Sequence, residues 1–171
     1  MKARNLLSIR DLEIHLDDRG SFCELSRNDW SEMVGFAVGQ VSLSSSVTGV
    51  LRGFHYSSDH QRQAFILLSG EIFEVVLDVS KAGLADSSKF AQRITAEYGP
   101  LLCVQDYQTA HAYQVIQDCQ MLYLNERPYD RELERNFHWL SVGTEIWPLK
   151  DPLISERDRN APIIQVGSRC S

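Results

Sequence analysis

The chain has 171 residues, of which 43% are hydrophobic and 23% are charged, a composition typical of a folded globular protein. Its formal net charge is −6 and its lysines and arginines are scattered, so it lacks the basic tract that neutralises phosphates and no nucleic-acid partner is expected. No stretch approaches the roughly 18 apolar residues that cross a membrane, and the N-terminus has no apolar signal core, so we expect a cytoplasmic protein without membrane contact.

Short runs rich in β-branched and aromatic residues, bounded by Gly, Asp, Asn and Ser, recur along the chain and predict strands. In chain order the predicted strands are Leu12–Leu16, Ser21–Leu25, Phe36–Ser44, Val50–Tyr56, Gln63–Leu68, Glu71–Val79, Ala91–Ala96, Leu101–Val104, His111–Val115 and Gln120–Asn125. Ser26–Val34 begins with a candidate N-cap serine and is the one predicted helix. Ser69-Gly70 predicts a hairpin turn between two of these strands.

Many short strands separated by turns every 8–12 residues or so are typical of a β-sandwich or barrel. We therefore predict an all-β fold, a jelly roll (double-stranded β-helix) of the cupin type with a few short helices. No repeat, low-complexity tract or linker divides the chain. Residues 1–171 are thus predicted to form a single domain, with a flexible C-terminal tail from about residue 163.

Four cysteines, Cys23, Cys103, Cys119 and Cys170, lie far apart in the sequence and form no CxxC pair. Zinc and redox motifs depend on such close pairs. The cysteines are therefore predicted to be reduced small residues, mostly buried, and no metal is expected.

One segment, Val50–Tyr56 (VLRGFHY), places an arginine and a histidine close together in a predicted strand. Period-2 alternation predicts that Arg52 and His55 point to opposite faces of the sheet, with His55 on the inward face. Taken alone, an inward histidine is more often a hydrogen-bonded core residue than a catalyst.

The surroundings of this segment carry further motifs in a fixed order. They are DDRGSFCE (17–24), QVSLSSS (40–46), GVLRGFHY (49–56), GEIFEVVLD (70–78), Ala110-His111, Tyr123, Tyr129-Asp130, Trp147-Pro148 and LISERD (153–158). Together they resemble the dTDP-4-dehydrorhamnose 3,5-epimerase family from about Asp17 to Pro162. The resemblance implies a jelly-roll homodimer without a cofactor, an isomerase of deoxysugar biosynthesis that inverts carbon centres beside the C4 ketone of a nucleotide-linked 6-deoxyhexose.

Such inversion needs a base on one face of the sugar, an acid on the other and a group that stabilises the intervening enolate. The resemblance implies that His55 is the base, that Asp158 fixes its tautomer and raises its basicity, and that Tyr123 is the acid. Without the resemblance, Asp158 would be interpreted as a solvated charge and Tyr123 as a half-buried aromatic of a sheet.

The resemblance also implies a set of substrate-binding residues. They are Arg19, Glu24, Gln40, Arg52, Gln63, His111 and Tyr129. Arg19 and Arg52 match positions that hold the diphosphate, which a planar guanidinium can grip with two hydrogen bonds. Tyr129 matches an aromatic that packs near the nucleotide, and His111 a second pocket histidine that binds the sugar or steadies the enolate.

Two departures from the family pattern concern the pocket. The family carries a lysine seven residues before the glycine that is Gly70 here, and this chain has Gln63 instead. A neutral amide is a weaker donor to a developing oxyanion than a cation, and the neighbouring Arg62 would point to the other face. The usual Ala-His-Gly-Phe reads AHAY at 110–113. The nucleotide, the sugar and the number of inverted centres therefore stay open.

Two other classes of protein compete with an epimerase. A metal-dependent cupin enzyme would use histidines such as His55, His60 and His111, but the close His-x-His pair expected of such a site is missing. A catalytically silent sugar-nucleotide-binding relative is suggested by the loss of the lysine at Gln63. The presence of both an acid and a base argues against it.

Overall fold

The computed structural model of the protein describes residues 5–27, 31–80 and 87–166. Its strands are β1 (Leu7–Asp11), β2 (Ile14–Asp17), β3 (Gly20–Cys23), β4 (Gln40–Ser46), β5 (Leu51–Ser57), β6 (Gln63–Asp78), β7 (Lys89–Thr95), β8 (Leu101–Gln105), β9 (Thr109–Asn125) and β10 (Glu134–Asn136). The helical elements are α1 (Ser31–Val34), the 3-10 turn η3 (Trp139–Val142) and α2 (Glu156–Arg159). The predicted all-β fold with short helices is confirmed.

Parts of three predictions fall outside the described residues. The predicted helix Ser26–Val34 includes residues 28–30, and only its end is observed, as α1. Cys170 and most of the predicted flexible tail lie beyond residue 166. Within the described residues, no helix is both long and apolar enough to span a membrane.

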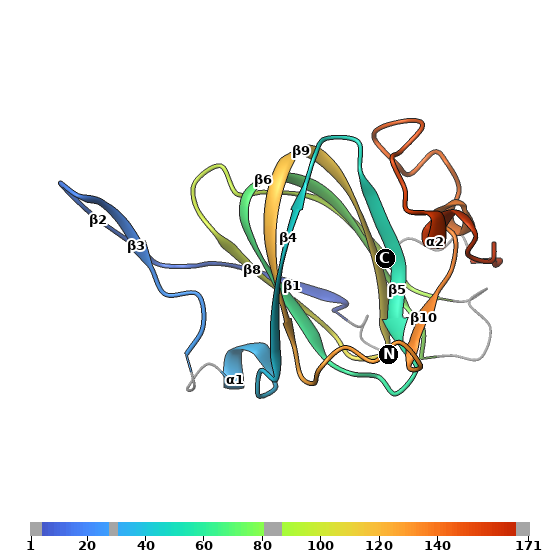
Figure 1. Cartoon of the computed structure of the whole chain (residues 1–171), viewed down its shortest axis with the longest axis horizontal. Coiled ribbons are helices and arrows are strands. Elements are labelled where there is room, and N and C mark those ends of the chain that lie inside the picture. Colours follow the sequence, from blue (N-terminus) through green and yellow to red (C-terminus); the bar gives the residue numbers. More distant parts are fainter. Residues whose placement is uncertain (1–4, 28–30, 81–86, 167–171) are drawn as a thin grey trace.

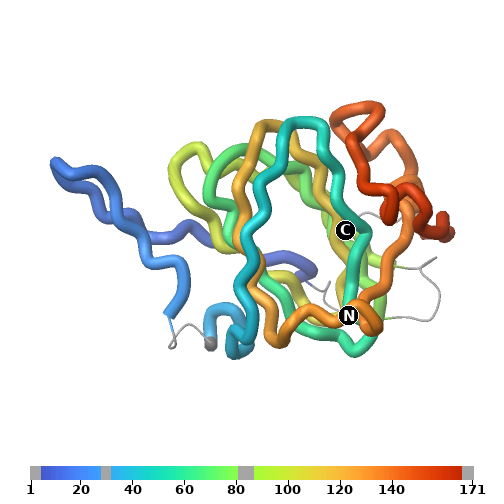
Figure 2. Tube along the Cα trace, viewed as in Figure 1, coloured from blue at the N-terminus to red at the C-terminus, as the bar shows by residue number. Residues whose placement is uncertain are grey.

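One sheet of eight strands builds the body of the molecule, in the order β1-β8-β6-β9-β5-β10, with β4 added to β9 and β7 added to β6. All its pairings are antiparallel. The strands curve around a shared interior, whereas β2 and β3 form a separate hairpin that extends away from it (Figures 1 and 2).

The two central strands, β6 and β9, are longer than the sequence predicts. β6 runs unbroken from Gln63 to Asp78, so the hairpin predicted at Ser69-Gly70 is wrong. Gly70 has a φ of +86°, a value typical of turns, but here it lies in a β-bulge where the pairing with β9 shifts register. Because β9 continues beside β6 past this bulge, the predicted strands His111–Val115 and Gln120–Asn125 are parts of one strand, β9.

A buried aromatic cluster attaches the C-terminal segment to β5. Phe54 is fully buried and stacks on Phe137, with ring centroids 4.7 Å apart. Trp147 packs edge-on against Phe54, and the buried Gln114 amide makes two hydrogen bonds with the backbone of Leu149. The chain after β10 is thereby held across β5, and α2 lies beside that strand (Figure 1).

The bulge at Gly70 gives a test of the fold. A Cβ at Gly70 would overlap the backbone carbonyl of Asp118 and come within 2.8 Å of Cys119 Cα, whereas a Cβ at Gly35, which has the similar φ of +83°, would meet nothing. We expect Gly35→Ala to lower the free energy of unfolding by about 1–2 kcal/mol through its left-handed backbone alone. Gly70→Ala should lower it by about 4 kcal/mol or more. Urea unfolding measures both, and equal losses would contradict the close packing of the bulge.

Candidate active site

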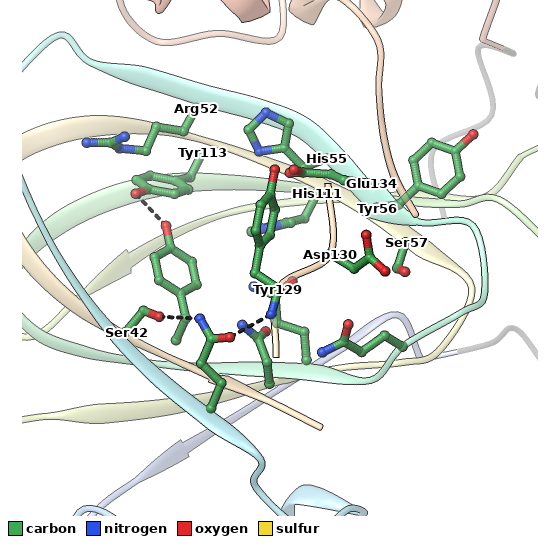
Figure 3. A pocket seen from close by; sticks show the side chains of 15 residues that line it. Ser42, Arg52, His55, Tyr56, Ser57, His111, Tyr113, Tyr129, Asp130 and Glu134 are labelled. Atoms are coloured by element: carbon green, nitrogen blue, oxygen red, sulfur yellow. Dashed lines mark hydrogen bonds between the residues drawn. The ribbon is translucent and has the colours of Figure 1, made fainter. Parts of the chain in front are cut away.

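A cavity of about 360 Å³ opens between β4, β5, β9 and the segment around β10 (Figure 3). Its wall consists of Gln40, Ser42, Arg52, His55, Tyr56, Ser57, Gln61, Gln63, His111, Tyr113, Tyr123, Asn125, Tyr129, Asp130 and Glu134. Every side chain of this wall carries a polar group, and three of its four tyrosines come from β9 and the loop that follows it. Such a cavity suits a polar ligand that also presents flat or apolar faces.

Seven of the ten predicted site residues line this cavity, namely Gln40, Arg52, His55, Gln63, His111, Tyr123 and Tyr129. Asp158 lies behind His55, outside the cavity wall. Arg19 and Glu24 lie on and just after the β2–β3 hairpin, and the cavity of their own chain does not include them.

His55 and Asp158 form a close pair between β5 and α2. The distance from His55 Nε2 to Asp158 Oδ1 is 2.7 Å, and the Asp158 side chain is only 5% exposed. Ser155 caps α2 by accepting from the Asp158 amide. If Nε2 carries the proton toward the carboxylate, Nδ1 is left unprotonated and can act as a base.

The same pair sets the charge of Asp158. Burial by itself raises the pKa of this carboxyl group, but the hydrogen bond and charge of His55, together with Ser155, outweigh burial, so the pKa lies below its ordinary value. Asp158 is therefore an anion at neutral pH and holds one nitrogen of the imidazole.

The predicted faces of β5 need a correction. Arg52 and His55 do not point to opposite sides, since both line the cavity. The β5–β9 pairing shifts register between Gly53 and His55, and this bulge turns Phe54 into the core. A bulge inserts one unpaired residue, so residues three apart come to share a face.

Tyr123 projects from β9, where it is paired with Ser42 of β4. Its hydroxyl oxygen lies 2.7 Å from that of Tyr113, a contact marked in Figure 3. Burial raises the pKa of both phenols above the ordinary value. Both keep their protons at neutral pH, so Tyr123 has a proton to donate into the cavity.

Comparison with known proteins agrees with this geometry. Residues 4–165 match the family model described as dTDP-4-dehydrorhamnose 3,5-epimerase. The chain is 30% identical over 151 residues to the dTDP-4-dehydrorhamnose 3,5-epimerase of Shigella flexneri, covering 84% of this chain and 83% of the relative. The chain belongs to this family.

Solved structures of epimerases share its fold. A 3'-monoepimerase from Streptomyces bikiniensis, in complex with dTDP-quinovose, superposes with a TM-score of 0.78 at 26% identity, over 95% of this chain and 86% of that one. A dTDP-6-deoxy-D-glucose-3,5-epimerase from Legionella pneumophila gives a TM-score of 0.77 at 24% identity, over 95% and 94% of the two chains. The predicted jelly-roll fold is thereby confirmed.

A carboxylate that the sequence analysis missed supports the second histidine of this epimerase-family pocket. Glu74 on β6 is fully buried, and its Oε1 lies 3.0 Å from His111 Nδ1 and 3.3 Å from the amide nitrogen of Gln105. Burial raises the pKa of Glu74, against the effect of His111. An acidic residue in the apolar run of GEIFEVVLD was the available signal, because a buried carboxylate needs a partner.

A second missed carboxylate, Glu134 on β10, lines the cavity near His55. It accepts from Arg157 at 2.8 Å. Burial raises its pKa, but Arg157, Tyr129 and the His55 charge outweigh burial and lower it. The charged run DRELER (130–135) gave no indication of this position, because only the pairing of β10 with β5 brings Glu134 beside the pocket.

Neutral amides and a hydroxyl form the opposite wall of the cavity. Gln40 donates to Ser42 at 2.9 Å and accepts from the Tyr129 amide at 2.6 Å. Gln63 pairs with Asn125 across β6 and β9. The adjacent Arg62 turns away to an ion pair with Glu126. Among the described residues, Arg52 is then the one lysine or arginine in the cavity wall.

The predicted binding residues Arg19 and Glu24 make only local contacts. The Arg19 guanidinium is 90% exposed and binds Asp17, which raises its pKa, while Glu24 pairs with Arg27. In the part of the chain that the structure describes, no three His, Cys, Asp or Glu side chains gather in a way that could hold a metal ion. The donor set of a metal-dependent cupin is thus not assembled there.

The lowered pKa of Asp158 predicts how stability depends on pH. Its carboxylate stabilises the fold above the unfolded pKa of about 3.9, and this contribution is lost as the pH falls through the folded pKa. The unfolding free energy of the wild type should exceed that of Asp158→Asn at neutral pH, and the gap should shrink below about pH 4. Denaturant titrations over this pH range measure it. A gap independent of pH would mean that shape, rather than charge, is what Asp158 supplies.

Proposed function

We propose that this chain inverts C3, C5 or both in a nucleotide-diphosphate-linked 4-keto-6-deoxyhexose, as a step of deoxysugar biosynthesis. The observation that carries the proposal is the presence, in one cavity, of a histidine held by a buried carboxylate at 2.7 Å and a buried phenol that keeps its proton. Membership of the epimerase family supports the same reaction.

The proposed chemistry moves two protons. His55 takes a proton from the carbon beside the ketone, and the electron pair of the broken C–H bond passes to the ketone oxygen to give an enolate. Tyr123 then gives its proton to the same carbon from the other side, the ketone forms again and the centre is inverted. Asp158 stabilises the imidazolium that forms on His55, at the 2.7 Å contact.

The remaining lining would bind the substrate. Arg52 is the cation available to a phosphate, and Tyr129, whose side chain is largely exposed, offers a ring to the nucleobase. Gln63 stands where the family carries lysine, so the ketone oxygen would receive neutral hydrogen bonds, with His111 beside them. A neutral donor stabilises an enolate less than a cation does, which favours a substrate or a number of inverted centres different from those of the rhamnose pathway.

Exchange of solvent deuterium tests the reaction. A panel of dTDP-, CDP- and GDP-linked 4-keto-6-deoxyhexoses in D₂O should include one that acquires deuterium at C3 or C5, and His55→Ala should slow this exchange by about 10³-fold or more. His60→Asn is the matched control, since His60 is exposed and lies outside the cavity. NMR measures both positions.

The panel also separates the competing functions. Absence of exchange with every sugar would contradict the epimerase and leave the silent sugar-nucleotide-binding relative that the neutral Gln63 suggests. Exchange at one carbon alone would identify an enzyme that inverts a single centre.

We also propose that the protein is a homodimer whose pockets are completed across the interface. The β2–β3 hairpin extends from the body (Figure 1) and exposes Leu16 and Phe22 at 79% and 63%. Val41 and Leu43, at 55% and 60%, are exposed on β4, an edge strand among the described residues. Apolar surface of this kind on a hairpin and a sheet edge is commonly covered by a second chain.

A dimer would also explain how Arg19 and Glu24 could bind substrate. In one chain, the Arg19 guanidinium is 90% exposed and remote from the cavity. A hairpin laid against a partner would bring Arg19 and Glu24 to the partner's pocket, where Arg19 would add the second cation expected for a diphosphate.

Mixing two defective variants tests this arrangement. If Arg19 serves the partner's pocket, a heterodimer of His55→Ala and Arg19→Ala has one pocket with both defects and one intact pocket. Random pairing of the two chains should then restore about a quarter of wild-type activity. The two variants are co-expressed, each with its own tag so that their ratio can be checked, and the activity of the mixture is measured. Light scattering establishes the dimer. A monomer, or mixtures no more active than their parents, would contradict the proposal.

A further inference from the structure

Three serines alternate along β4 and face the cavity side of β9 and β5. Each contacts a different polar side chain: Ser42 accepts from Gln40 at 2.9 Å, Ser46 accepts from Arg52 at 3.1 Å, and Ser44 lies 3.5 Å from the hydroxyl of Tyr113. The period-2 spacing of the serines puts them on one face of the strand. Of these contacts, the one with Tyr113 leads to the proposed acid.

Tyr113 is a buried phenol in an otherwise apolar cluster. It is 1% exposed and packs with side chains such as Val115 and Met121. A phenylalanine ring would fill this cluster equally well, so packing does not account for the hydroxyl group. The hydroxyl reaches the cavity wall and lies 2.7 Å from the hydroxyl of Tyr123.

This contact bears on the direction of the Tyr123 proton, because either of the two hydroxyls can donate the hydrogen bond. A phenol carries one proton, and a proton aimed at the substrate is not available to Tyr113. The hydrogen bond between the two oxygens must then be donated by Tyr113, which can in turn accept from the more distant Ser44. Tyr113 can therefore donate to the Tyr123 oxygen while the Tyr123 proton points into the cavity.

The contact also acts on the product of proton transfer. When Tyr123 gives up its proton it becomes a phenolate at a buried position, and an unpaired buried charge is costly. A hydrogen bond to an ionised acceptor is about twice as strong as one between neutral groups. The Tyr113 hydroxyl, already at 2.7 Å, supplies that bond without moving.

We propose that Tyr113 is a positioning residue for Tyr123, aiming its proton and stabilising its phenolate in the reprotonation half of the epimerisation, an inference that rests on the proposed function. In that half-reaction the Tyr123 O–H bond breaks and a C–H bond forms from the enolate electron pair. The O–H electrons stay on Tyr123 as the phenolate, to which Tyr113 donates. A proton from water then restores Tyr123, while His55 returns its own proton to water.

Replacing Tyr113 with Phe tests the inference, because this change removes the hydroxyl group and keeps the ring. Deuterium exchange into recovered, uninverted substrate reports proton abstraction by His55 alone, whereas formation of the inverted sugar also requires Tyr123. Tyr113→Phe should slow inversion about 10–100-fold and leave exchange within about threefold of wild type, so the ratio of exchange to inversion rises.

Controls separate this role from a structural one. Tyr98→Phe removes a hydroxyl from a side chain that is 88% exposed and outside the cavity, and it should leave both rates unchanged. A Tyr113→Phe protein that loses exchange and inversion in equal proportion would overturn the inference, since pocket shape would then explain the loss. An unchanged ratio at wild-type rates would also overturn it. A wild-type protein that neither exchanges nor inverts any ketosugar would instead overturn the proposed function.

Discussion

The pairing of β9 with three other strands is the constraint on which the rest of the structure depends. β9 runs beside β6 along nearly its whole length, while its other edge is shared by β5 near its start and β4 near its end. This sharing brings His111 and Tyr113 from one half of β9 into the same cavity as Tyr123 from the other. Glycines at the bulges, above all Gly70, let the backbones approach closely enough for these pairings.

Each reactive group of the cavity has a polar partner from another part of the chain. Asp158 holds His55, Glu74 holds His111, and Tyr113 holds Tyr123, at 2.7, 3.0 and 2.7 Å. Partners of this kind fix the tautomer of a histidine or the direction of a phenol proton, and they stabilise the charge that proton transfer creates. The site thus depends on the packing that docks the C-terminal segment on β5 as much as on the strands themselves.

Family membership and the altered pocket lead to a consistent interpretation of the chemistry. The pairs that would move protons are present, whereas the group expected to face the ketone oxygen is the neutral Gln63. In the described part of one chain, the cavity wall holds a single lysine or arginine, Arg52. A second cation from a partner's hairpin would offset this shortage for the phosphates, but not for the enolate. The substrate is therefore the feature most open to divergence within the family.

The sequence by itself determined the strand-rich class, because alternation and turn residues are local, and it determined the family, because its motifs occur in order over most of the chain. Tertiary structure alone decided the length of β6 and β9, since a glycine at positive φ looks the same in a bulge as in a turn. It also decided that Arg52 and His55 share a face and that Glu74, Glu134 and Tyr113 lie beside the predicted site residues. Their contacts join residues that are 10 to 37 positions apart in the sequence. Local sequence patterns cannot predict such contacts, because these depend on how the strands pair.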